Sequence, residues 1–286
     1  MRLWLSVLLA AALLAAGAAS AFAVPSLAGP TGLVMCPTAD IAPAGMWQVA
    51  AGNRSMRINM YQESFDISDW SINALKGVAD DAEVFVTYQR VTDGKNTDVW
   101  EYGGKYLIGE DLFPRQGFLG GTKVAVGGSL SRWADALGIY DDMVSEVSTT
   151  DVKTVRAYLV ATKQLAPTYT GEWPWEAPSG TRIVATVGLM YFRVDPDRGE
   201  ANSVLRPFLG VEVTGQRQLT LLAEYRLKDS SVESHGEFAF AIRKPFGSST
   251  TVEVGLSNEE AFEIKSGVEL GEQVRQVDFL AVGGDL

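Results

Sequence analysis

The sequence predicts an all-β protein: an antiparallel transmembrane β-barrel of about 12 strands, within a range of roughly 10 to 14, preceded by a cleaved signal peptide. Three observations support this prediction. The first 23 residues have the pattern of a secretory signal. Apolar and polar residues alternate along most of the remaining chain. Many alternating segments are about 10–12 residues long, which suits a tilted strand that crosses a bilayer.

The signal peptide is predicted at residues 1–23. Arg2 is its only charged residue, an apolar stretch runs from Leu3 to Ala16, and Ala21-Phe22-Ala23 supplies an A-x-A site before Val24. This order is that of a signal removed after export through the Sec pathway. An uncleaved anchor is the alternative, but a spanning helix needs ~20 apolar residues.

The rest of the chain divides into an N-terminal lead-in (24–45) and the β-barrel (46–286). The lead-in is rich in Pro, Gly and Thr, so a strand does not start easily there. It could lie inside the barrel as a plug, cap its periplasmic mouth, or be exposed. No later run of 18 or more apolar residues is present, so helical spans are not predicted.

Period-2 alternation defines the strands. From Leu205 the residues Leu205, Pro207 and Leu209 share one face, and Arg206 and Phe208 share the other. The predicted strands are 46–57, 67–77, 82–92, 97–108, 119–131, 151–165, 181–193, 204–214, 217–228, 236–246, 249–257 and 262–270, with 274–282 as a further candidate. Bacterial single-chain barrels have even strand numbers, so one of these assignments is expected to fail.

The two faces of the strands favour a membrane barrel over a soluble secreted carbohydrate-binding β-sandwich. The polar face mixes charges with small residues, as a crowded lumen requires. Its lumen-lining candidates are Glu83, Glu101, Lys105, Lys123, Arg156, Arg182, Arg206, Glu212, Glu224, Arg226, Glu237 and Arg243. Aromatic residues near strand ends on the apolar face fit a membrane-interface girdle. They are Trp47, Trp70, Trp100, Tyr191, Tyr225 and Phe246.

Composition excludes several functional classes. The formal net charge of −11 argues against nucleic-acid binding, which needs a basic footprint. Cys36 is the only cysteine, so neither a disulfide framework nor a cysteine metal cluster is expected. A lipid anchor on Cys36 is the less favoured alternative, because Met35 fits poorly before a lipidated cysteine. We expect no cofactor and no metal.

The candidate chemistry outside the lumen is sparse. His235 is the only histidine and could serve an outer-membrane hydrolase as its base, but no G-x-S-x-G motif accompanies it. The acidic pairs Asp80-Asp81, Asp141-Asp142 and Glu259-Glu260 lack the spacing of a calcium loop. The segment around Trp173 and Trp175 fits either carbohydrate stacking or an interfacial anchor. The chain is therefore expected not to be an enzyme.

The lead-in also carries a family resemblance. Gly29-Pro30-Thr31-Gly32-Leu33-Val34-Met35-Cys36-Pro37-Thr38-Ala39, followed by Gly45, resembles the opening of YjbH-like and related Gram-negative outer-membrane β-barrels. The stretches 206–210 and 251–256 are similar to strands of such barrels. The resemblance implies a bacterial outer-membrane location and a role in exopolysaccharide or polar-solute passage, or in envelope structure. It also implies contact with outer-membrane lipid, lipopolysaccharide and polysaccharide or envelope-assembly partners.

Overall fold

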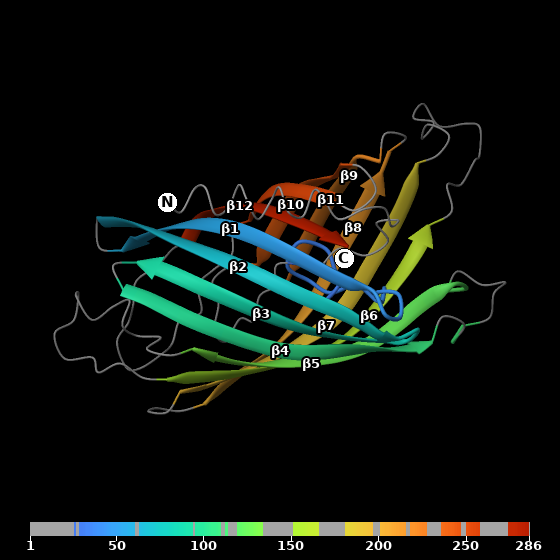
Figure 1. Cartoon of the computed structure of the whole chain (residues 1–286), viewed down its shortest axis with the longest axis horizontal. Coiled ribbons are helices and arrows are strands. Elements are labelled where there is room, and N and C mark those ends of the chain that lie inside the picture. Colours follow the sequence, from blue (N-terminus) through green and yellow to red (C-terminus); the bar gives the residue numbers. More distant parts are fainter. Residues whose placement is uncertain are drawn as a thin grey trace.

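The fold is a single closed antiparallel sheet. The computed structural model describes residues 26, 29–60, 63–93, 95–109, 112–113, 119–133, 151–165, 181–196, 201–215, 218–227, 236–246, 250–257 and 274–285. The wall consists of β1 (Trp47–Met60), β2 (Glu63–Ala79), β3 (Ala82–Asp93), β4 (Lys95–Gly109), β5 (Thr122–Trp133), β6 (Val152–Leu165), β7 (Arg182–Pro196), β8 (Asn202–Thr214), β9 (Thr220–Arg226), β10 (Glu237–Phe246), β11 (Thr250–Ser257) and β12 (Val274–Asp285). Each strand pairs with its sequence neighbour, and β12 pairs with β1 to close the barrel (Figure 1).

The closed sheet confirms the predicted fold class and shows that the β-sandwich alternative is wrong. A sandwich needs two sheets packed face to face, whereas here one sheet returns to its own first strand. Within the described ranges, no helix is long and apolar enough to cross a membrane. The signal peptide assignment at 1–23 lies outside the described residues.

The last strand is the one that the sequence offered only as an extra candidate. Val274–Asp285 pairs with both β11 and β1, so it closes the barrel. The predicted strand at 262–270 lies outside the described residues. β2 begins at Glu63 rather than at 67, because backbone pairing with β1 continues from Met60↔Glu63 past the point where the apolar alternation stops. Gln48↔Asp285 places the two ends of the wall at the same end of the barrel.

The wall has the two faces that the alternation predicts. Large apolar side chains such as Leu205, Leu221 and Ile242 point outward and are 51–56% exposed, although they belong to regular strands. In water such a continuous apolar surface would be unstable, and lipid is the medium that removes it from water. The chain is therefore a transmembrane barrel, with its polar residues turned inward.

Glycines on the inner face make room for aromatic rings from the neighbouring strand. Phe85 faces Gly103, Tyr158 faces Gly127, and Phe208 faces Gly188 across the strand registers. A Cβ atom on any of these glycines would overlap the ring of its partner. Each ring thus occupies the place that a larger side chain on the neighbouring strand would take.

A larger residue at one of these glycines is expected to weaken the barrel. Gly188→Val should lower the free energy of unfolding by about 1–3 kcal/mol, because its side chain would push the Phe208 ring out of its place. Urea unfolding in lipid vesicles, followed by tryptophan fluorescence, measures this change. The double variant Gly188→Val/Phe208→Leu should recover part of the loss. An unchanged midpoint for the single variant would contradict this packing.

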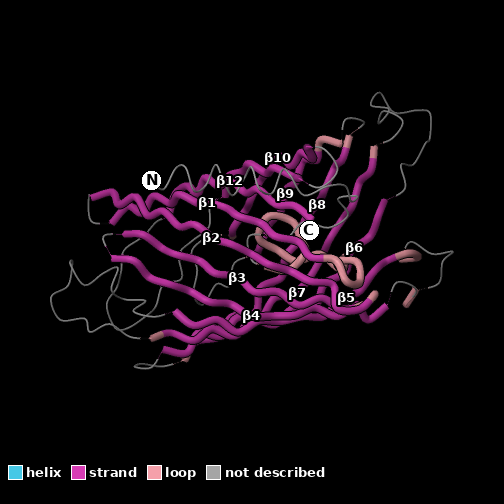
Figure 2. The backbone as a smooth tube through the Cα atoms, viewed as in Figure 1, coloured by secondary structure: helices cyan, strands magenta, loops and turns pink. Residues whose placement is uncertain are grey.

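Residues 29–45, here called the inner segment, lie within the ring of strands (Figures 1 and 2). It doubles back on itself: Gly32 bridges Pro37, Leu33 N donates to Cys36 O at 2.9 Å, and Thr38 N donates to Thr31 O at 3.1 Å. Leu33, Val34 and Cys36 are fully buried. At its end, Gly45 N donates to Gly77 O of β2 at 2.8 Å, which ties the segment to the wall before β1 begins.

Candidate functional site: the charged lumen and the inner segment

The structure brings most of the predicted lumen residues onto the inner face. Buried there are Glu83, Glu101, Lys105, Arg206, Glu224, Arg226, Glu237 and Arg243, and partly buried are Lys123, Arg156 and Glu212. Arg182 follows the same inward register at the start of β7 but is exposed. The lumen is therefore lined with both signs of charge, and much of this charge is directed at the inner segment.

The first anchor of the inner segment is the ion pair between Glu83 of β3 and Lys105 of β4. The two side chains are 3.0 Å apart and neither is exposed. The Glu83 carboxylate accepts hydrogen bonds from Thr31 N at 3.0 Å and from Ala42 N at 2.9 Å. The Lys105 ammonium donates to the carbonyl oxygens of Thr31 and Thr38, each at 3.0 Å. The two charges therefore neutralise each other, and both groups also form hydrogen bonds with the main chain of the segment.

Thr31 adds side-chain contacts at the same place. Its hydroxyl lies against both carboxylate oxygens of Glu83, at 3.1 and 3.2 Å, and donates to Asp40 O at 2.5 Å. The Lys105 ammonium also contacts this hydroxyl. The threonine thus fixes the first anchor from within the segment, which gives a physical reason for a threonine at this position of the lead-in.

The second anchor lies on the opposite wall and holds the turn at Leu33–Cys36. The Glu224 carboxylate of β9 accepts hydrogen bonds from Met35 N at 3.0 and 3.1 Å and from Cys36 N at 3.1 Å. The Arg243 guanidinium of β10 donates to the carbonyl oxygens of Gly32 and Leu33, each at 3.2 Å. The carboxylate thus accepts from the N–H groups of the turn, and the guanidinium donates to its C=O groups.

Two further contacts hold the rest of the segment. Ala39 N donates to the Thr162 hydroxyl of β6 at 2.9 Å. Lys123 forms an ion pair with Asp40 at 3.1 Å, and this pair is more accessible than the first anchor. Most of the hydrogen bonds from the lumen are thus to the main chain of the segment rather than to its side chains.

Several functional residues were missed by the sequence reasoning. Glu253 of β11 accepts a hydrogen bond from Arg243 at 2.6 Å, and the two are register partners. Opposite charges on the neighbouring strands β8, β9 and β10 also meet: Arg226 binds Glu237 at 2.7 Å, and Arg206 reaches Glu237 at 3.0 Å. Writing out the cross-strand register would have found both pairs, because Glu237 faces Arg226 directly.

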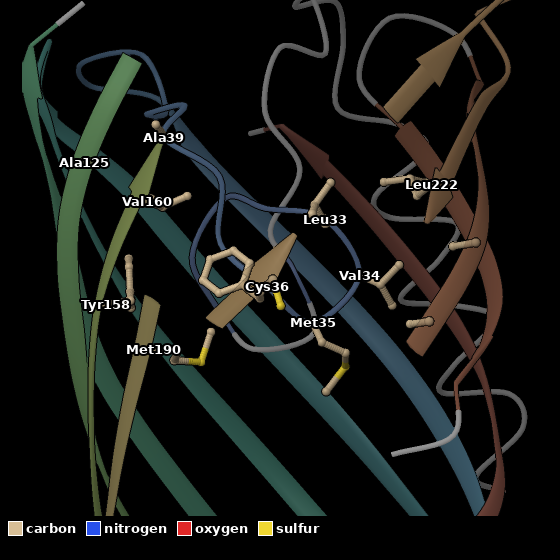
Figure 3. Packing of buried hydrophobic residues seen from close by; sticks show 13 residues of the cluster. Leu33, Val34, Met35, Cys36, Ala39, Ala125, Tyr158, Val160, Met190 and Leu222 are labelled. Atoms are coloured by element: carbon tan, nitrogen blue, oxygen red, sulfur yellow. The ribbon is translucent and has the colours of Figure 1, made fainter. Parts of the chain in front are cut away.

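An apolar patch on the inner wall receives the turn. Leu33, Val34, Met35 and Cys36 pack against side chains that include Tyr158, Met190, Phe208 and Leu222 (Figure 3). Leu33 also lies against Gly210 of β8 so closely that a Cβ there would overlap it. The apolar recess is the place at Gly210 where Leu33 packs against the wall, and it adjoins the second anchor.

The predicted interface aromatics lie on the outer face where side chains are described. Trp47, Trp70, Trp100 and Tyr225 are 37–46% exposed and Tyr191 is half-buried, whereas the side chain of Phe246 lies outside the described residues. Tyr88 joins Trp70 and Trp100, with ring centroids 5.2 and 4.8 Å apart. Trp47 starts β1 and Trp100 lies early in the oppositely directed β4, so the two are near opposite ends of the barrel.

The remaining sequence candidates contribute little to the site. His235, Trp173, Trp175 and the acidic pairs at 141–142 and 259–260 lie outside the described residues. Asp80 and Asp81 form the turn between β2 and β3. In the part of the chain that the structure describes, no group of three or more His, Cys, Asp or Glu residues could hold a metal ion.

Cys36 offers a direct readout of the inner segment. Burial, and then the nearby Glu224 carboxylate, raises the pKa of the Cys36 thiol well above its ordinary value. Because the folded pKa lies above the unfolded one, docking is favoured below the ordinary thiol pKa and weakens as the pH rises beyond it. We expect a maleimide to leave Cys36 unlabelled in the native barrel at pH 7 to 8.5 and to label it fully in urea. Rapid native labelling that rises about tenfold per pH unit, as for a free thiol, would contradict this burial.

Comparisons with solved structures found matches with TM-scores below 0.5. The translocator domain of the autotransporter NalP from Neisseria meningitidis is 12% identical, with 86% of this chain and 89% of that chain covered and a TM-score of 0.48. The outer membrane protein Omp33 of Acinetobacter baumannii is 6% identical, with 85% and 98% covered and a TM-score of 0.40. No family model and no curated protein sequence matches the chain.

Proposed function

We propose that this protein is a non-enzymatic β-barrel of the bacterial outer membrane that serves the passage of a polar solute and is closed by its own inner segment. The observation that carries the proposal is the pair of charged anchors, Glu83–Lys105 and Glu224–Arg243, which bind the main chain of residues 31–42 inside the lumen. Wall side chains just fill the interior of a barrel of about 8 strands, whereas this wall runs from β1 to β12 and binds a separate segment inside it.

The lumen chemistry supports a polar cargo. Both signs of charge line the inner face, and the outer face is apolar. A polysaccharide offers hydroxyl groups that carboxylates and cations bind well, and the resemblance of residues 29–39 to YjbH-like barrels points in the same direction. Outer-membrane lipid and lipopolysaccharide are the expected surroundings. Envelope-assembly proteins would be partners in export.

An envelope-structural role is the second candidate. It is favoured by the fully buried Glu83–Lys105 pair, because such a pair holds the inner segment firmly. The two candidates differ in whether the segment ever leaves the lumen. The hydrolase alternative has its own test: His235→Ala should leave membrane lipid content unchanged.

Two measurements test the proposal. Outer-membrane fractionation with heat-modifiable gel migration should identify an inserted barrel. In planar bilayers the purified full chain should be closed most of the time and show rare openings in the presence of a voltage. If neither the protein nor variants of the anchors ever open, the passage function is excluded and the envelope-structural role remains.

A further inference from the structure

The second anchor and the apolar recess beside it form a defined binding subsite. Glu224 accepts from two consecutive main-chain N–H groups, Met35 and Cys36. Arg243 donates to two consecutive carbonyl groups, Gly32 and Leu33. The subsite thus offers one acceptor, the Glu224 carboxylate, and one donor, the Arg243 guanidinium, and these match the N–H and C=O groups of a peptide turn.

The recess adds selectivity for an aliphatic side chain. Gly210 leaves the wall of β8 open beneath Leu33, and Phe208 and Leu222 belong to the same buried cluster. In Figure 3, Leu33 points toward Leu222 from the turn. Arg243 is itself fixed by Glu253 at 2.6 Å, so its position does not depend on the turn alone.

We propose that this subsite is a peptide-binding site that the chain occupies with its own Leu33–Cys36 turn, and that a polypeptide segment of the same chemistry binds there in place of the turn. The proposal rests on the proposed closure by the inner segment. Its ligand is an effector that opens the barrel and is separate from the cargo. The required chemistry is a turn with consecutive free N–H groups, consecutive free C=O groups and one branched aliphatic side chain.

A peptide in solution competes poorly with a tethered segment, because tethering gives the turn a millimolar effective concentration. The test therefore uses a full-length variant whose own turn is weakened. Leu33→Asp places a charge in the apolar recess and should release the turn. Ala44→Asp is the matched control, since it adds the same charge at an exposed position of the same segment.

The probe is a fluorescent peptide of residues 29–40 with Cys36→Ser, and binding is measured by anisotropy in detergent. We expect the Leu33→Asp protein to bind it at least ~10-fold more tightly than the wild type or Ala44→Asp, because its site is empty. Adding Glu224→Gln to Leu33→Asp should weaken binding by at least ~10-fold through loss of charged hydrogen bonds. A scrambled peptide should not bind.

Three outcomes would overturn the proposal. In the first, Cys36 becomes reactive in Leu33→Asp but the peptide does not bind. In the second, Cys36 stays shielded in Leu33→Asp, so the recess does not hold the turn. In the third, the scrambled peptide or a neutral oligosaccharide binds as tightly as the peptide. Free conduction by the wild type would instead contradict closure of the barrel by the inner segment. The peptide-binding measurement does not depend on conduction, so it would still test the subsite.

Discussion

Lys105→Met should weaken the docking of the inner segment by about 3–5 kcal/mol, the usual consequence of leaving one member of a buried ion pair alone. Glu83 would keep its charge in a place where neither side chain is exposed, and Thr31 and Thr38 would lose the ammonium bound to their carbonyl groups. Maleimide labelling of Cys36 in the native barrel should therefore become roughly 150–5,000-fold faster.

The chain offers a matched control for this prediction. Lys123→Met also removes a lysine that forms an ion pair with the inner segment, at Asp40. The Lys123 side chain is 38% exposed, however, and that of Asp40 is 25% exposed. Exposed pairs contribute at most about 1 kcal/mol, so labelling should change by less than about tenfold. Equal effects of the two substitutions would show that burial of the Glu83–Lys105 pair is not what holds the segment.

Glu224→Gln should raise the open probability in planar bilayers by roughly 30–150-fold, since a loss of about 2–3 kcal/mol is expected when charge-assisted hydrogen bonds are replaced by neutral ones. Both carboxylate oxygens accept from the turn, whereas the amide of glutamine keeps one acceptor oxygen and places an NH2 group where the other oxygen accepted. Single-channel recording of the full chain measures this change.

Glu212→Gln is the control for Glu224→Gln. Glu212 faces the same lumen from β8, and no described hydrogen bond joins it to the inner segment. The substitution removes the same charge without the same contacts. A similar rise in open probability for both variants would indicate that lumen charge governs opening and that the contact with the turn does not.

The alternation of single residues was enough to predict the barrel and its two faces. Leu205, Leu209 and Leu221 point outward and Arg206 points inward, as their period of two requires. This pattern is local, because it depends only on which side of an extended backbone a residue occupies. It could not identify 274–282 as the strand that closes the barrel, because that role depends on pairing with β1 and β11.

The sequence by itself determined that charged residues such as Glu83, Glu224 and Arg243 gather on the inner face. Only the tertiary structure decided what they bind. Met35 is separated from Glu224 by 189 residues, so no local pattern could indicate that this carboxylate accepts the N–H groups of the turn. The lead-in has no periodicity of its own, and its position is set by contacts with walls that form from the rest of the chain. Closure of the sheet creates the lumen, and the charges in it then select the main chain of residues 29–45.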